Sequence, residues 1–195
     1  MADVWVVTGG IGSGKSTIRR TMGELGAVTI DADRVGHEVL EPDGAAFSQV
    51  AATWPSVVVD GHIDRLRLAA IVFADEDELQ RLESISHPAI AALITERIAE
   101  AAENDVVVVE ISVPKDLLGV GWLRTIVADL PDEERVGRLV ERGMDRTDVE
   151  RRMRAQPSRD EWQARGRWIV PTSGSREAVE RRVRKLYQDV IRLAR

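Results

Sequence analysis

The segment Gly9-Gly10-Ile11-Gly12-Ser13-Gly14-Lys15-Ser16-Thr17 constrains the fold of this chain more than any other feature. It matches the pattern G-x-x-x-x-G-K-[ST], which forms a phosphate-binding loop between a β-strand and an α-helix. The flanks agree with this, because the β-prone run 4–7 precedes the loop and a helix-compatible segment, 16–25, follows it. An ordinary glycine-rich turn is the alternative, and the complete motif in its required context argues against it.

The residue types of this loop suit the phosphates of a nucleoside triphosphate, which carry dense negative charge. The glycines let the backbone turn tightly and aim N–H groups inward, and the following helix N-terminus adds a favourable dipole. Lys15 is expected to reach the β- and γ-phosphates, and the Ser16 hydroxyl to ligate Mg²⁺. The predicted nucleotide-binding residues are Gly9, Gly10, Ile11, Gly12, Ser13, Gly14, Lys15, Ser16 and Thr17.

Composition narrows the class of protein. The 195 residues, 44% hydrophobic and 31% charged, suit one globular domain with a small inserted subdomain. Without cysteine there are neither disulfides nor thiolate metal sites. No apolar run reaches the ~20 residues of a membrane span, and the early first strand leaves no room for a signal peptide, so a cytoplasmic protein is expected. A net charge of −6 argues against a general nucleic-acid binder.

Carboxylates follow two predicted strands. Residues 27–30 read as a strand that hands over to a helix at Asp31-Ala32-Asp33, and the uniformly apolar strand 106–109 ends in Glu110. Strand ends in a parallel sheet face the ligand crevice, so Asp33 could accept a proton from an attacking hydroxyl. Position alone leaves helix capping by Asp31 or Asp33 equally open. Glu110 is a predicted Mg²⁺ ligand.

The pattern between residues 41 and 104 is mostly helical. Apolar spacing predicts helices at 65–73, 75–82 and 89–102, with Pro88 in the first turn of the last one. We therefore expect 41–104 to be a helical acceptor-binding subdomain inserted into a nucleotide-binding core of residues 1–40 and 105–195. His87, an isolated histidine, suits a helix start as well as a binding site.

The last third of the chain predicts strands at 125–129 and 168–170 and helices at 132–142 and 176–193. Between them, the arginine-rich segment 142–167 is expected to form two short helices that fold over the nucleotide as a lid. For most of its arginines taken singly, a solvated helix face with i,i+4 charge pairs is the ordinary alternative. The predicted fold class is α/β, a P-loop NTPase-type parallel sheet flanked by helices, with a helical substrate-binding insertion and a helical lid.

These residues resemble the dephospho-CoA kinase family, which carries out the last step of coenzyme A synthesis. The likeness includes the loop 8–17 and Asp31-Ala32-Asp33, and it is most specific at Asp60-Gly61-His62-Ile63-Asp64-Arg65 and His87-Pro88-Ala89-Ile90. The lid of the family also has an Arg, an Arg and a Gln where this chain has Arg142, Arg151 and Gln156.

The resemblance implies ATP- and Mg²⁺-dependent phosphorylation of the ribose 3′-hydroxyl of dephospho-CoA, a small-molecule reaction without nucleic acid or membrane. It makes Asp33 the expected base, places Arg65 and His87 near the CoA moiety, and makes Arg142 the lid arginine that meets the transferring phosphate. The predicted catalytic residues are Lys15, Asp33 and Arg142. A monomer is the working expectation.

Two segments differ from the family pattern, 110–118 and 166–174. They keep two alternatives open: a catalytically silent or regulatory relative that binds nucleotide or CoA species, and a kinase for another small hydroxylated acceptor. A GTPase is disfavoured because the sequence has no Asn-Lys-x-Asp motif.

Overall fold

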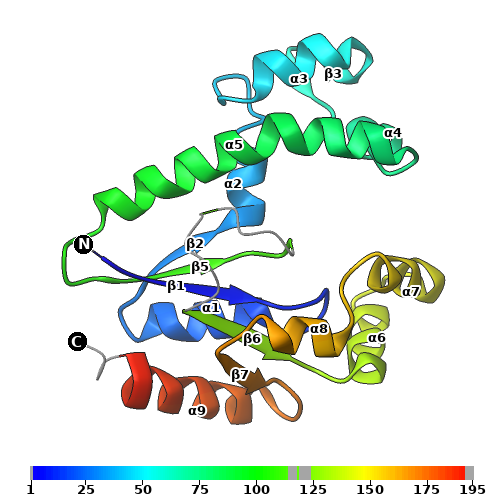
Figure 1. Ribbon diagram of the computed structural model, residues 1–195. Coiled ribbons are helices and arrows are strands. Elements are labelled where there is room, and N and C mark those ends of the chain that lie inside the picture. The colour runs from blue at the N-terminus through cyan, green and yellow to red at the C-terminus, as the bar shows by residue number, and fades with distance from the viewer. Residues whose placement is uncertain (1, 114–117, 119–123, 192–195) are drawn as a thin grey trace. The chain divides into compact units, whose positions relative to one another are not determined.

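The computed structural model describes residues 2–113, 118 and 124–191, which form two compact units (Figure 1). Unit 1 consists of residues 1–31 and 98–195, and unit 2 of residues 32–97. The assignment of 41–104 to acceptor binding and of 142–167 to a lid concerns function and stays a prediction. Among the described residues, no helix combines the length and apolarity needed to cross a membrane.

Unit 1 is built on a five-stranded parallel sheet, as the sequence predicted. Its strands lie in the order β2-β5-β1-β6-β7. Their bounds are β1 Asp3–Thr8, β2 Val28–Asp31, β5 Val106–Glu110, β6 Thr125–Asp129 and β7 Trp168–Pro171. Every residue of β5 is buried, which explains its uninterrupted valines. The register pairs Asp31 with Glu110, so two carboxylates end adjacent strands.

Helices cover the sheet and bury its apolar side chains. One face carries α1 (Lys15–Glu24) and α9 (Arg176–Leu186), and a π-helical turn, Tyr187–Ile191, extends α9 (Figure 1). The sequence also predicts an apolar face on this helix, made by Val179, Val183, Leu186, Val190 and Leu193. Val179 and Val183 are buried and Leu186 and Val190 pack against the core, as predicted, and Leu193 lies outside the described residues. Tyr187 and Ile191, at the two ends of the π-helical turn, are buried in the same core. Trp5, Ile18, Met22 and Val183 belong to the same core.

Three further helices of unit 1 follow β6 and lead to β7. They are α6 (Asp132–Glu141), α7 (Arg146–Arg154) and α8 (Arg159–Ala164). Asp145 caps α7 by accepting from the N–H of Asp148, and Ser158 and Glu161 form a reciprocal capping box on α8. The predicted pair of short helices in this segment is therefore confirmed.

Unit 2 is mostly helical, as predicted, with more elements than the sequence pattern indicated. Its elements are α2 Ala32–Glu38, α3 Phe47–Thr53, the 3₁₀ turn Pro55–Val57, β3 Val58–Val59, β4 His62–Ile63, α4 Arg65–Val72 and most of α5 Glu76–Glu100. The dipeptide Asp60-Gly61 predicts a turn, and the structure confirms it, because both residues have positive φ (49° and 79°) and join β3 to β4. Asp64 caps α4.

One prediction for unit 2 was wrong. Helices 75–82 and 89–102 are a single helix, α5, and Pro88 lies inside it instead of in a first turn. Proline cannot donate to the carbonyl four residues earlier, but its fixed φ is helical, so a helix can continue at the loss of one hydrogen bond. Ile85 and Ile94, on either side of Pro88, are both buried, and this burial stabilises the continuous helix.

Candidate nucleotide site

The glycine loop between β1 and α1 has the tight conformation that its sequence predicted. Gly9, Gly12 and Gly14 have φ values of +139°, +76° and +93°, a region that favours glycine. A Cβ on Gly9 would lie 2.6 Å from the carbonyl oxygen of Ala128, which rules out a larger residue there. Within the described residues, the N–H groups of Gly12 and Gly14 have no hydrogen-bond acceptor. They can therefore donate to an anion held in the loop.

Lys15 lies against this loop, with only 8% of its surface exposed. Its Nζ donates to the carbonyl oxygens of Gly9 (2.9 Å) and Gly10 (3.3 Å). Two neutral carbonyl groups of the loop thus contact the ammonium group. Phosphate oxygens carry more negative charge than these carbonyls and would form stronger, charge-assisted hydrogen bonds with it.

Ser16 and Glu110, the two predicted Mg²⁺ ligands, lie in direct contact. The Ser16 Oγ donates to Glu110 Oε1 at 3.0 Å, and the Glu110 side chain is only 6% exposed. A hydroxyl and a carboxylate are oxygen donors of the kind that Mg²⁺ prefers, so the residues fit such an ion. Among the described residues, no group of three or more His, Cys, Asp or Glu could hold a metal. Mg²⁺ commonly completes its shell with water and substrate phosphate oxygens.

Sequence reasoning missed Arg19, which pairs with both strand-end carboxylates. Its Nε donates to Glu110 Oε2 at 2.6 Å and its Nη2 to Asp31 Oδ2 at 3.0 Å. Arg19 lies one helical turn after Ser16, so the i,i+3 spacing on α1 was the signal that could have identified it. Its positive charge offsets the repulsion between the two carboxylates.

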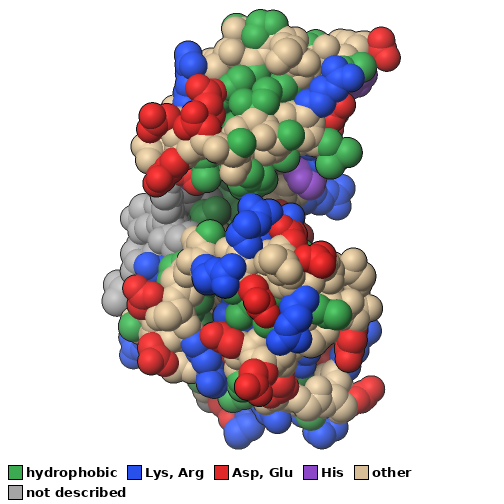
Figure 2. All heavy atoms as spheres, turned by 90° about the vertical axis from the view of Figure 1, so that its right-hand side faces the viewer, with side chains coloured by type: hydrophobic (Ala, Val, Ile, Leu, Met, Phe, Trp, Pro, Cys, Tyr) green, Lys and Arg blue, Asp and Glu red, His purple; other side chains and the backbone are tan. Residues whose placement is uncertain are grey.

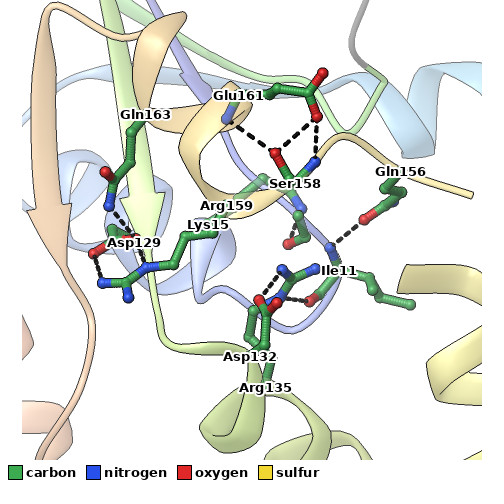
Figure 3. A network of polar contacts seen from close by, with 11 residues as sticks. Ile11, Lys15, Asp129, Asp132, Arg135, Gln156, Ser158, Arg159, Glu161 and Gln163 are labelled. Carbon is green, nitrogen blue, oxygen red and sulfur yellow. Dashed lines mark hydrogen bonds and ion pairs between the residues drawn. The ribbon is translucent and has the colours of Figure 1, made fainter. Parts of the chain in front are cut away.

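The helices α6 and α8 also contact the loop and the sheet (Figure 3). Arg135 Nε donates to the carbonyl oxygen of Ile11 at 2.9 Å, and the Ile11 N–H donates to Gln156 Oε1 at 2.8 Å. At the end of β6, Arg159 binds both oxygens of Asp129, each at 2.8 Å. Gln163 Nε2 donates to Asp129 Oδ1 at 3.0 Å, so α8 is attached to the sheet through one carboxylate.

Thr172 lies in 166–174, one of the two segments that depart from the family pattern. Its contacts join three parts of the site. Its Oγ1 is 2.5 Å from the carbonyl oxygen of Ser13 and 3.0 Å from that of Asp129. Arg138 Nη2 in turn donates to the Thr172 carbonyl oxygen at 2.5 Å. This departure therefore holds the end of β7 against the phosphate loop. In the other departing segment, residues 114–117 lie outside the described residues.

Most of the other arginines of 142–167 lie on solvated helix faces and pair with nearby acidic residues, which is the alternative that the sequence left open. Figure 2 views unit 1 from the side of α6 and α7 and shows basic and acidic side chains interspersed. Arg146 pairs with Glu150, and Arg151 and Arg152 both pair with Asp148. These exposed pairs each contribute little to stability.

The remaining predicted site residues belong to the end of α6 and to the helices α2, α4 and α5. Arg142 is exposed at the end of α6 in unit 1. In unit 2, Asp33 is exposed in the first turn of α2, two residues beyond the end of β2. Arg65 is the exposed first residue of α4, and His87 is half-buried within α5. Their binding and catalytic roles stay predictions.

The Asp129 anchor predicts a measurable effect on stability. Hydrogen bonds from Arg159, more than any other influence, hold the pKa of the Asp129 carboxyl below its usual value. We expect Asp129→Asn to lower the free energy of unfolding by about 2 kcal/mol at pH 7, because a buried carboxylate loses a charge-assisted pair. Chemical denaturation of both proteins measures this difference.

The same anchor predicts the sign of the pH dependence. Because the pKa of Asp129 is lower in the folded than in the unfolded protein, its carboxylate contributes fully to folding stability above the unfolded-state pKa of about 3.9. This contribution is lost as the pH falls through the folded-state pKa. The difference in free energy of unfolding between wild type and Asp129→Asn should therefore become smaller below pH ~4. Asp160→Asn, an exposed neighbour on α8, is the control. An equal loss in both variants would contradict a specific Asp129 anchor.

Comparisons with known proteins agree across the whole chain. The family model described as dephospho-CoA kinase matches residues 4–177. A dephospho-CoA kinase of Thermobifida fusca is 37% identical over 190 residues, covering 95% of each chain. One of Geobacter sulfurreducens is 36% identical over 188 residues, covering 93% of this chain and 95% of its own.

Solved structures show the same fold. A crystal structure from Thermus thermophilus is 31% identical with a TM-score of 0.80, covering 97% of this chain and 98% of its own. The dephospho-CoA kinase of Campylobacter jejuni, at 24% identity, aligns over 100% of both chains with a TM-score of 0.74. Shikimate kinase from Acinetobacter baumannii shares the fold at 14% identity, with a TM-score of 0.57 over 99% and 95% of the chains.

Proposed function

The chain belongs to the dephospho-CoA kinase family, and we propose on this basis that it transfers the γ-phosphoryl group of ATP to the ribose 3′-hydroxyl of dephospho-CoA, giving coenzyme A. The observation that carries the proposal is the match over more than nine-tenths of the chain to curated kinases of this one activity. A silent relative or a kinase for another acceptor is not favoured, because neither would explain that match.

The phosphate loop supports the ATP half of the reaction. The N–H groups of Gly12 and Gly14 and the ammonium of Lys15 would bind the phosphates and orient the γ-phosphoryl group. Ser16 and Glu110 would hold Mg²⁺, which when bound neutralises charge on the phosphates. Arg142 would add positive charge at the transferring group, and its exposed position leaves it able to move toward a bound nucleotide.

The acceptor half rests on residues of unit 2. Asp33 would accept the proton of the attacking 3′-hydroxyl, since it follows β2, a strand whose carboxyl end faces the ligand side of a parallel sheet. Arg65 and His87 would contact the CoA moiety, Arg65 through its charge and His87 through its ring nitrogens. We also propose that the enzyme is a monomer acting on small molecules in the cytoplasm.

The proposal is tested by ADP release from ATP and Mg²⁺, measured with and without dephospho-CoA, with the product identified by mass. We expect ADP release to depend on dephospho-CoA and the acceptor to gain one phosphate, giving coenzyme A. If the rate of ADP release did not change when dephospho-CoA was added, while nucleotide binding was intact, the proposal that dephospho-CoA is the acceptor would be overturned. A screen of small hydroxylated acceptors would then replace it.

A further inference from the structure

Ile11, the third residue of the phosphate loop, is held by the segment that runs from α6 to the start of α8. Its side chain packs into a small apolar cluster separate from the main core. The members of this cluster are Val136, Leu139, Val149, Met144 and Met153. The phosphate loop thus inserts one side chain between α6 and α7, although these helices lie more than 120 residues later in the sequence.

Both backbone groups of Ile11 are bound by the same segment (Figure 3). The N–H donates to Gln156 Oε1 at 2.8 Å, and the carbonyl oxygen accepts from Arg135 Nε at 2.9 Å. Because Gln156 already accepts the Ile11 N–H, that group is not directed at a phosphate. The N–H groups of Gly12 and Gly14, which have no acceptor within the described residues, remain available to a phosphate.

Arg135 is fixed in turn by burial and by its own helix. Only 3% of its surface is exposed, and its Nη1 donates to Asp132 Oδ1 at 2.9 Å. The buried Nη2 has no hydrogen-bond partner in the described part of the chain, and a Cβ on Gly10 would overlap it. The guanidinium group therefore lies close to the loop backbone, and a side chain at position 10 would displace it.

These contacts matter because Ile11 lies between two glycines. Gly10 and Gly12 have little steric restriction, and Gly12 has φ +76°, so the peptide groups on either side of Ile11 could rotate if nothing held them. A loop that must be ordered when ATP arrives loses binding free energy to that ordering. A loop ordered beforehand does not.

We propose that Gln156 and Arg135 are positioning residues that clamp the Ile11 peptide, so that the phosphate loop is ordered before the nucleotide binds and its conformation is coupled to α7. The inference rests on the proposed function and extends it to two residues that bind the backbone of the phosphate loop. Its prediction is that loss of the clamp weakens nucleotide binding more than it slows chemistry.

Gln156→Leu tests the clamp, because leucine has a similar size and cannot accept a hydrogen bond. Gln156 and Arg135 both line a hollow of about 560 Å³ between α6, α7 and α8, so the new side chain has room. We expect the Kd of MgADP, measured by calorimetry, to rise about 10-fold, because the variant loses one hydrogen bond that orders the loop. The KM for ATP should rise in parallel, with kcat changed less than threefold.

Amide exchange at Ile11, followed by NMR in the absence of nucleotide, reports the clamp independently of binding. The Ile11 N–H should be protected in wild type, exposed in Gln156→Leu, and protected again in Gln156→Glu, whose carboxylate keeps an acceptor at this position. Gln188→Leu, an exposed glutamine far along the chain, is the control and should leave both Kd and exchange unchanged.

A double-mutant cycle separates one clamp from two independent contacts. If the side chain and the backbone of Ile11 act together, Ile11→Ala and Gln156→Leu should be less than additive in the Kd of MgADP. An unchanged Kd together with a protected Ile11 amide in Gln156→Leu would overturn the inference. Absence of MgADP binding by wild type would instead count against the proposed function, while the exchange measurement would still test the clamp.

Discussion

Replacing Asp33 by Asn is expected to lower kcat by about 10²–10⁴-fold while ATP binding is largely retained. Asparagine keeps the size of the side chain and its hydrogen-bonding reach, but it cannot accept the proton that the attacking hydroxyl must lose. Asp33 is exposed in the first turn of α2, so the substitution leaves the apolar core unchanged. Steady-state kinetics with dephospho-CoA and calorimetry with MgADP measure the two quantities separately.

Asp43→Asn is the matched control for this variant, because Asp43 is another exposed aspartate of unit 2 that the proposed function does not use. It should leave kcat within twofold of wild type. If Asp33→Asn lowered kcat by less than tenfold, Asp33 would no longer be a candidate for the base.

Replacing Lys15 by Met should lower kcat/KM by about 10³-fold, an effect on both nucleotide binding and catalysis. The Lys15 ammonium lies at the loop carbonyls of Gly9 and Gly10, next to the N–H groups that would receive the phosphates. Methionine fills a similar volume without charge, so the positive charge at the γ-phosphoryl group is lost. Calorimetry should also show weaker MgADP binding.

Because Lys15 is largely buried, its replacement could act through stability, and the thermal unfolding midpoint distinguishes the two effects. Lys185→Met, an exposed lysine on α9, controls for loss of a positive charge elsewhere. A Lys15→Met protein that unfolded near the wild-type temperature and kept kcat/KM within tenfold would contradict the role given to Lys15.

The sheet and the phosphate site could be predicted because their signals are local. A strand, a glycine loop and a helix follow one another within 4–25, and the valine run of β5 indicates burial on both faces. Parallel strands end at one edge, so the approach of Glu110 to Ser16 followed from the sequence alone. These inferences depend on nearest neighbours in sequence or in the sheet.

What could not be predicted depends on contacts between distant residues. The bond from Ile11 to Gln156 joins positions 145 residues apart, and no periodicity records it. The helix α5 continues through Pro88 because packing of Ile85 and Ile94 outweighs one missing hydrogen bond, which a local rule for proline does not weigh. In the sequence, Thr172 was noticed only as part of a segment that differs from the family pattern. In the structure, its hydroxyl group holds the end of β7 to the phosphate loop.

The position of unit 2 in the chain has a consequence for how such kinases can change. It is inserted between β2 and β5, which are parallel neighbours and need a crossover connection of a dozen or more residues in any case. The entropic cost of closing a connection grows only with the logarithm of its length, about 0.6 kcal/mol per doubling. Residues 32–97, which we propose to bind the acceptor, can therefore be lengthened, shortened or exchanged at this point at a small entropic cost of chain closure, and they are the module to replace when redesigning acceptor preference.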